Sequence, residues 1–248
     1  MKTRIKQLLC AVSLSLVSAL TAHAQQNLFN APNGDITPKG RVFYQQQINM
    51  YTQRLETKGH FVYGLGRGWD AGVNVVGIAG QFRPNWEFQT NDVRSAGALY
   101  PVVMATLQKQ FTLAKRWKLN VGTQMGTNLT GTTDRKAFNQ FTYGLVGYHP
   151  APGRRILAGP YVTNPAYVGP GNRAGVIVGY EWKLTEKWYL MGDWISGRHS
   201  QSVGVFGLMY WPLKHVQFCA GLLTPNDNPF ENNGLVFEIN ILGWDATH

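Results

Sequence analysis

Six charged side chains occupy positions from which they can line a shared interior. Each falls in a segment where apolar and polar residues alternate, cleanly for the first four and less cleanly for the last two: Lys118, Glu181, Lys183, Glu238, Arg41 and Asp193. Facing inward together, such carboxylates and cations can line a narrow permeation path and set its selectivity. They can equally pair into a structural network that fills the interior, because unpaired buried charge is costly. The sequence leaves both interpretations open.

A second candidate for chemistry is the stretch GRHSQS at 197–202, where His199 stands beside Ser200. A His and a Ser within hydrogen-bond reach can act as base and nucleophile in a lipid hydrolase. On a strand, however, adjacent side chains point to opposite faces. The sequence also offers no orienting acid or oxyanion donor at a suitable spacing. The favoured interpretation is therefore an exposed polar loop, with a hydrolase as an alternative.

Other chemistry-bearing patterns are weak. His60, His149 and His215 are scattered without metal-ligand spacing, and the glycines at 64–68 do not precede a helix. The net charge of +10 comes without a basic helix or ribbon that would bind nucleic acid. We therefore predict no metal, no cofactor and no nucleic-acid partner.

The elements that position these residues are strands, because alternation is the primary strand signal. In the clearest case Trp117, Leu119 and Val121 share one parity, while Lys118 and Asn120 share the other. Runs of this kind extend along the chain and predict about twelve strands, with ten as the fallback. Their expected ranges are 41–50, 59–66, 70–81, 100–112, 117–129, 138–149, 154–163, 174–184, 188–197, 202–212, 215–224 and 233–243.

The connections between these strands alternate in length. Every second connection is short, at 67–69, 114–116, 150–153, 185–187 and 212–214. The others are longer and polar or Pro-containing at 51–58, 82–99, 130–137, 164–173 and 225–232, with only 198–201 brief. Short turns at one rim and long loops at the other are typical of outer-membrane barrels. The predicted fold is therefore all-β, a closed antiparallel up-and-down transmembrane β-barrel at 40–248.

Four tryptophans flank the short turns: Trp69, Trp117, Trp188 and Trp211. In an up-and-down meander they gather at one rim, where indole rings prefer the lipid–water boundary. They are therefore predicted to form an aromatic girdle. The alternative is that each packs into the core of a soluble β-sandwich.

The N-terminus reads as an export signal. Basic residues precede the apolar run 8–20 and the small-x-small site Ala22-His23-Ala24, so we predict a signal peptide at 1–24 cleaved near Ala24. Residues 25–39 show no periodicity and contain turn formers, so they are expected to form a periplasmic lead-in tucked into the barrel mouth. No later window has 18 uninterrupted apolar residues, which excludes a helical span. The predicted location is the bacterial outer membrane.

The surplus of positive charge falls mainly in or beside the long connections, at Arg54, Lys58, Arg83, Arg94, Arg135, Lys136, Arg173 and Arg198. On the outer face these side chains would meet lipopolysaccharide phosphates, which Arg binds well. Ordinary solvated loop charge explains them equally. Expected partners are outer-membrane lipid and lipopolysaccharide, together with the periplasmic chaperones and barrel-assembly machinery that every such barrel requires.

Three hairpins carry a family resemblance: GLGRGWDAGVNVVG, FTLAKRWKLNVGTQMG and YEWKLTEKWYLMGDW. With them the chain resembles Gram-negative outer-membrane β-barrels, most of all the small channels grouped with the meta-pathway phenol-degradation family. The resemblance implies passage of small apolar or aromatic molecules, as an analogy at the level of the fold. It departs from many such barrels at the C-terminus, which runs on to GWDATH instead of ending on an aromatic residue.

These observations favour a non-enzymatic channel or uptake facilitator for small solutes. The first alternative is a closed structural or surface-recognition barrel whose loops carry the function. The second is a lipid hydrolase at the outer rim. The sequence specifies neither a solute nor an oligomeric state.

Overall fold

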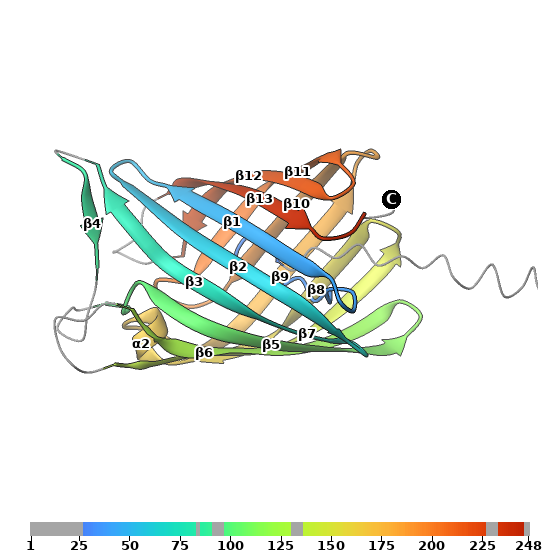
Figure 1. Cartoon of the computed structure of the whole chain (residues 1–248), viewed down its shortest axis with the longest axis horizontal. Helices are drawn as coiled ribbons and strands as arrows, with labels where there is room; N and C mark the ends of the chain where they lie inside the picture. The colour runs from blue at the N-terminus through green and yellow to red at the C-terminus, as the bar shows by residue number, and fades with distance from the viewer. Residues whose placement is uncertain (1–26, 83–84, 91–96, 130–135, 227–232, 246–248) are drawn as a thin grey trace, which may run out of the picture.

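A closed β-barrel makes up most of the chain (Figure 1). The computed structural model describes residues 27–82, 85–90, 97–129, 136–226 and 233–245. Within them, twelve antiparallel strands form a ring, because β1 pairs with β2 on one side and with β13 on the other. The predicted all-β closed barrel and its count of twelve strands are confirmed.

The barrel strands follow one another in chain order, each paired with its neighbours. They are β1 (Val42–Met50), β2 (Arg54–Gly66), β3 (Trp69–Gln81), β5 (Val102–Ala114), β6 (Trp117–Asn128), β7 (Phe138–Ala151), β8 (Arg154–Thr163), β9 (Ala174–Lys183), β10 (Trp188–Ile195), β11 (Val203–Leu213), β12 (Val216–Pro225) and β13 (Gly234–Leu242). A short extra strand, β4 (Glu87–Gln89), pairs only with the last residues of β3 and was not expected from the sequence.

The turns at one rim are as short as the sequence predicts. Two residues separate β2 from β3, β5 from β6, β7 from β8, and β11 from β12. Between β2 and β3, Gly66, Arg67 and Gly68 have φ angles of 88°, 53° and 77°. Such left-handed backbone suits a tight hairpin and favours glycine.

One connection at the opposite rim was predicted wrongly. Residues 51–58 were expected to form a long loop, but β2 already begins at Arg54, so only three residues separate β1 from β2. The run Arg54-Leu55-Glu56-Thr57-Lys58 hides this strand because Leu55 is its one apolar residue. Glu56 is buried and Lys58 contacts groups inside the barrel, so polar residues here mark an inner face.

The two faces of the wall differ as the alternation predicts. On β6, Val121 and Met125 are each 43% exposed on the outside, whereas Asn120 and Asn128 are buried on the inside. The same pattern holds on β9 and β13. An apolar outer surface is what a barrel in a bilayer requires. The inner surface mixes polar residues with buried apolar ones such as Ile177 and Val236.

Three of the four flagged tryptophans lie on the outer face. Trp69, Trp117 and Trp188 are 40%, 45% and 44% exposed, and Trp188 packs against Tyr210 with ring centroids 4.6 Å apart. Trp211 is the exception, at 3% exposure. It shares its parity with the inward residues of β11, so its position next to a turn does not place it in the outer girdle. Its assignment to the girdle is therefore corrected.

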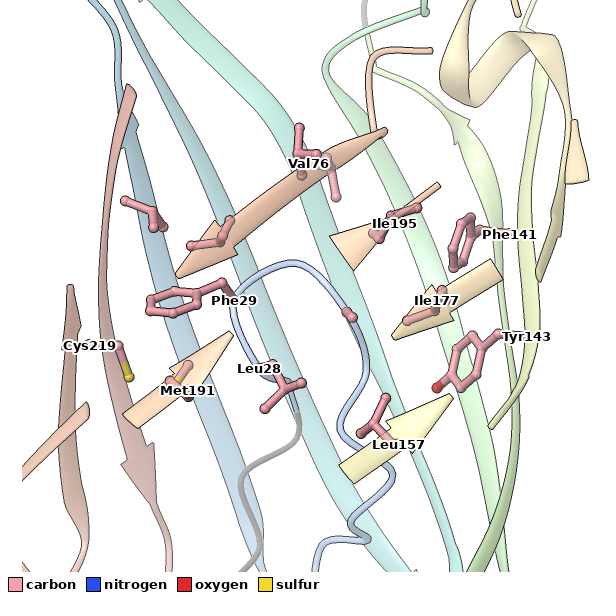
Figure 2. Packing of buried hydrophobic residues seen from close by; sticks show 14 of the residues in the cluster. Leu28, Phe29, Val76, Phe141, Tyr143, Leu157, Ile177, Met191, Ile195 and Cys219 are labelled. Atoms are coloured by element: carbon pink, nitrogen blue, oxygen red, sulfur yellow. The ribbon is translucent and has the colours of Figure 1, made fainter. Parts of the chain in front are cut away.

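The N-terminal segment Asn27–Thr37, called the plug below, lies inside the barrel. Leu28, Phe29 and Ala31 are each at most 1% exposed. Figure 2 shows Leu28 and Phe29 projecting from this segment into the space that the strands enclose. The segment expected at the barrel mouth therefore extends well into the lumen.

Several sequence predictions fall on residues outside the described ranges. These are the signal peptide at 1–24 and the loop residues Arg83, Arg94 and Arg135. Among the described residues the helix α2 (Pro165–Val168) lies between β8 and β9. In that part of the chain, no helix has the length and apolar character needed to cross a membrane.

Candidate functional site: the plugged lumen

The six charged residues singled out in the sequence fall in three settings. Glu181, Asp193 and Glu238 lie deep in the barrel, each 4% exposed. Lys118 is half-buried and approaches the plug, and Lys183 pairs at 2.8 Å with Glu186, which is largely exposed. Arg41 precedes β1 and is exposed. The structure therefore brings the first four toward one lumen and leaves Lys183 and Arg41 near its end.

One end of the plug is held by charge. The Asp35 carboxylate pairs with the Arg155 guanidinium, whose other nitrogen lies 2.6 Å from Glu181. Lys118 adds a fourth charge at 3.8 Å from Asp35. We call Asp35, Arg155, Glu181 and Lys118 the base anchor. Because Arg155 bridges two carboxylates with separate nitrogens, their buried negative charges are compensated without protonating either carboxylate.

Amide side chains of the wall complete the base anchor. Gln110 and Asn120 donate to the Gly34 carbonyl, and Gln108 donates to the Asp35 carbonyl at 2.8 Å. A loop buried in a barrel has no water to satisfy its backbone, so the wall must supply donors. The inward Asn and Gln residues of β5 and β6 do so here.

The other end of the plug is held by a single carboxylate. The backbone N–H groups of Phe29, Asn30 and Ala31 converge on Oδ2 of Asp193 at 2.7, 2.8 and 3.1 Å. In addition, Lys58 Nζ donates to Asn30 Oδ1 at 2.9 Å. We call Phe29–Ala31, Asp193 and Lys58 the tip anchor. Three N–H donors on one oxygen satisfy Oδ2 of the carboxylate and a turn of backbone, while Oδ1 is buried without a hydrogen-bond partner among the described residues.

The plug also fits the wall by shape. A side-chain carbon added at Gly179 would come 2.2 Å from Leu28 Cδ1, and one at Gly207 would come 2.8 Å from Phe29 Cζ. At Gly221 the same ring lies 3.0 Å away. The wall therefore leaves room for two apolar plug side chains by omitting its own, and we call these three glycines the sockets.

Little space is left in the lumen around the tip anchor. A cavity of about 40 Å³ lies between the plug and the wall, which is room for about three water molecules. Its lining comes from the plug, from six barrel strands and from the connections that hold Tyr167 and Gln201. The plug therefore occupies much of the described lumen at this level.

The His199 and Ser200 pair does not form a hydrolase site. Gln201 N–H donates to His199 Nδ1 at 3.2 Å, so the ring proton sits on Nε2, which lies 2.7 Å from the Tyr161 hydroxyl. Ser200 instead donates to the Val168 carbonyl. Burial lowers the pKa of His199 to about 4. Neither ring nitrogen is free to accept a proton from Ser200, which removes the base such a reaction needs.

Neighbouring groups at this rim are also buried and neutral. Burial raises the pKa of Tyr100 and of Tyr167 well above the ordinary value for tyrosine. Gln201 donates to the Tyr100 hydroxyl, which itself donates to the Tyr167 carbonyl at 2.9 Å. Over the described residues, no group of three or more His, Cys, Asp or Glu side chains is arranged to hold a metal ion.

Sequence reasoning placed the lead-in at the barrel mouth and missed both its depth in the lumen and the residues that hold it. Asp35 lies in an aperiodic stretch, and Arg155 lies on β8, whose alternation is weak. Lys58 was assigned to a long connection, but it lies on β2 and faces the lumen. One signal in the sequence could have pointed to them. Alternation places Glu181 and Lys118 on the inner face, and each buried charge needs a partner of opposite sign.

Comparison with known proteins supports the architecture. No protein-family model matches the chain, and no curated protein matches it in sequence. Among solved structures it is similar to the NanC porin, with a TM-score of 0.55 and 10% identity, over 82% of this chain and 99% of the porin. At that identity the similarity shows the fold alone, that of an outer-membrane β-barrel.

Two further structures are similar at lower scores. An outer membrane channel from Pseudomonas putida F1 has a TM-score of 0.48 at 10% identity, over 85% of this chain and 98% of the channel. Outer membrane phospholipase A from Escherichia coli has a TM-score of 0.44 at 10% identity, over 92% of this chain and 96% of the phospholipase. At TM-scores below 0.5 these similarities support no inference about this chain.

Proposed function

We propose that this protein is an outer-membrane channel for small solutes, and that the plug closes it. The observation that carries the proposal is that a separate segment fills the lumen at the tip anchor. A barrel of about twelve strands is too wide for side chains alone to fill easily. A barrel with a purely structural role can add bulk to its wall, whereas this wall keeps the glycine sockets and a set of polar donors.

The orientation follows from the rims. In outer-membrane barrels the short turns face the periplasm and the long loops face outward. The plug then enters from the periplasmic side, since Gly40 N–H bonds to the Gly64 carbonyl next to the β2–β3 turn. The tip anchor and its cavity lie nearer the outer rim, beneath Tyr167 and Gln201.

The lining favours small amphipathic solutes. Inward Gln, Asn, Asp and Glu residues share the wall with buried apolar residues such as Met191 and Ile195. Aromatic rings gather toward the outer rim, where the Phe141 and Tyr161 rings stack with centroids 5.3 Å apart. A solute with a polar and an apolar part could contact both kinds of side chain. We also propose a relationship to the meta-pathway phenol-degradation family, for which the cadence of three hairpins is the support. Aromatic cargo follows from that relationship as an analogy at the level of the fold.

Removing the plug is the direct test. A variant lacking residues 27–37 should insert into planar bilayers and give large, steady conductance, whereas the whole protein should be closed for most of the time. Heat-modifiable migration on gels checks that the variant folds as a barrel. A folded, inserted variant without conductance would exclude the channel and favour the closed structural barrel.

A further inference from the structure

The cavity between the plug and the wall is lined by one cation, Lys58, that has no carboxylate at ion-pair distance among the described residues. Lys58 Nζ donates to Asn30 Oδ1 at 2.9 Å and to Gln201 Oε1 at 3.4 Å, both of them neutral amides. Among the described residues, no carboxylate oxygen lies within ion-pair distance of Lys58. Asp193 acts on its charge only from farther away and is bound to three N–H groups. An ammonium group has three hydrogens, so one remains for the cavity.

A second donor, His60, lies two residues after Lys58 on β2 and lines the same cavity. His60 is 8% exposed and lines the cavity together with Lys58. Its Nδ1 lies 3.2 Å from the amide nitrogen of Asn27, which can only donate, so Nδ1 accepts and Nε2 carries the hydrogen. Among the residues that the structure describes, that Nε2 has no hydrogen-bond partner. A buried donor without a partner is costly, which points to a ligand that is present during function.

The rest of the lining fits a small organic anion. Phe29, Phe141 and Ile195 supply an apolar side to the cavity, opposite the two donors on β2. The volume of about 40 Å³ accepts a carboxylate with a very short carbon chain. Carboxylates bind well to a charged donor paired with a neutral one, because each oxygen receives its own hydrogen bond.

We propose that Lys58 and His60 form a binding site for small carboxylate-bearing solutes above the plug. As a transport site it rests on the proposed channel function, but binding itself needs no open channel. The carboxylate takes the free hydrogens of Lys58 Nζ and His60 Nε2, and its carbon chain lies against Phe29. Since Lys58 also holds Asn30, the occupied site shares a residue with the tip anchor.

Equilibrium binding of acetate to the detergent-solubilised protein tests the site. Carbon-13 acetate should broaden on binding at neutral pH, while acetamide, its neutral isostere, should bind at least about tenfold more weakly because it carries no charge for Lys58. Lys58→Gln keeps a donor for Asn30 but removes the charge, and it should weaken acetate binding about tenfold or more. Lys58→Arg should retain most of the binding. His60→Phe should weaken it by a smaller factor.

The matched control is Lys109→Gln, which removes the same charge from a lysine that lies over the Trp69 ring instead of in the cavity. It should bind acetate as the unaltered protein does. Equal binding of acetate and acetamide, or equal acetate binding by Lys58→Gln and Lys109→Gln, would overturn the site. If Lys58→Gln does not fold, undiminished acetate binding by folded His60→Phe overturns it instead.

Bilayer recordings separate this inference from the channel itself. Acetate binding that depends on Lys58, in a protein whose plug-deleted form stays silent, would retain the site and exclude the channel. Conductance by the plug-deleted form, without binding that depends on Lys58, would retain the channel and exclude the site.

Discussion

The two ends of the plug are held differently. At its base the plug's own carboxylate, Asp35, pairs with Arg155 and Lys118 of the wall. At its tip three backbone N–H groups of the plug donate to Asp193 of the wall. The base anchor joins four charges, with Arg155 at the centre. The tip anchor joins the backbone of Phe29–Ala31 to Asp193 without a matching side-chain cation at ion-pair distance. The two ends of one segment are thus held by different chemistry.

The difference bears on which end can move. Breaking the base anchor leaves like charges buried together, which a barrel interior tolerates poorly. Releasing the tip anchor leaves one carboxylate and three N–H groups, all of which water can satisfy as it enters from the outer rim. We therefore expect the tip to be released while the base stays fixed.

The largest effect should come from the base. Arg155→Met leaves Asp35 and Glu181 buried without their shared cation, so the free energy of unfolding should fall by about 3–5 kcal/mol. Denaturant unfolding in detergent, followed by heat-modifiable migration, measures it. Arg155→Lys should recover only part, because an ammonium does not bridge both carboxylates as the guanidinium does. A loss below 1 kcal/mol in Arg155→Met would show that the base anchor is not the stronger end.

Releasing the tip should have a smaller effect on stability and a larger one on conductance. Asp193→Ala removes the acceptor of three N–H groups, at a cost of about 1.5–3 kcal/mol, and should raise the open probability in bilayers. Asp193→Asn keeps one oxygen and should lie between Asp193→Ala and the unaltered protein. Asp245→Ala, at an exposed carboxylate beyond β13, is the control. Unchanged gating in folded Asp193→Ala would contradict release at the tip.

Acid should weaken the tip side through His199. Burial lowers the pKa of this ring from 6.5 to about 4, so the folded chain holds it neutral where an unfolded chain protonates it. Its contribution to stability is fully present above pH 6.5 and is lost as the pH falls toward about 4. The loss is at most about 3 kcal/mol, because one unit of pKa shift corresponds to about 1.4 kcal/mol. Gln201, which donates to Nδ1, also touches Lys58, so the loss is expected at the tip.

Thermal unfolding between pH 7 and pH 4 measures this contribution as the difference between the unaltered protein and His199→Gln. The remaining titratable groups are the same in both proteins, so their contributions to the pH dependence of stability cancel in the difference. Parallel curves for the two proteins across this range would rule out the contribution of His199.

The smallest effect is expected at the edge of the base anchor. Lys118 lies 3.8 Å from Asp35 and its side chain is 28% exposed, so Lys118→Met should cost less than about 1 kcal/mol. The same unfolding assay applies. A loss as large as that of Arg155→Met would mean that the base anchor depends on total charge and not on the bridging guanidinium.

Much of the barrel could be predicted because lipid imposes a strict pattern. Val121 and Met125 had to face outward once Asn120 and Asn128 faced inward, and the turn lengths set the order of the rims. Alternation did not predict the structure where the inner face of the wall contacts protein instead of water. Lys58 and Glu56 look like loop residues because a polar plug covers them, and Trp211 looks like a girdle residue because proximity to a turn does not fix parity.

The depth of the plug and its contacts could not be predicted for the same physical reason. Residues 27–37 have no period, since each residue is placed by a different strand of the wall and not by a repeating lattice. Asp35 and Arg155 are 120 positions apart in the sequence, and no local pattern joins them. Only the closed ring brings them together.

The sockets at Gly179, Gly207 and Gly221 have a consequence for the shape of any opened passage. These positions lie on β9, β11 and β12, which with β10 between β9 and β11 form one side of the ring. When Leu28 and Phe29 withdraw, that side is bare main chain at the three glycines, although Glu181 and Asp193 still project from β9 and β10. The resulting passage is eccentric, because its widest part lies next to these glycines. A bulky solute would therefore pass away from the central axis of the barrel.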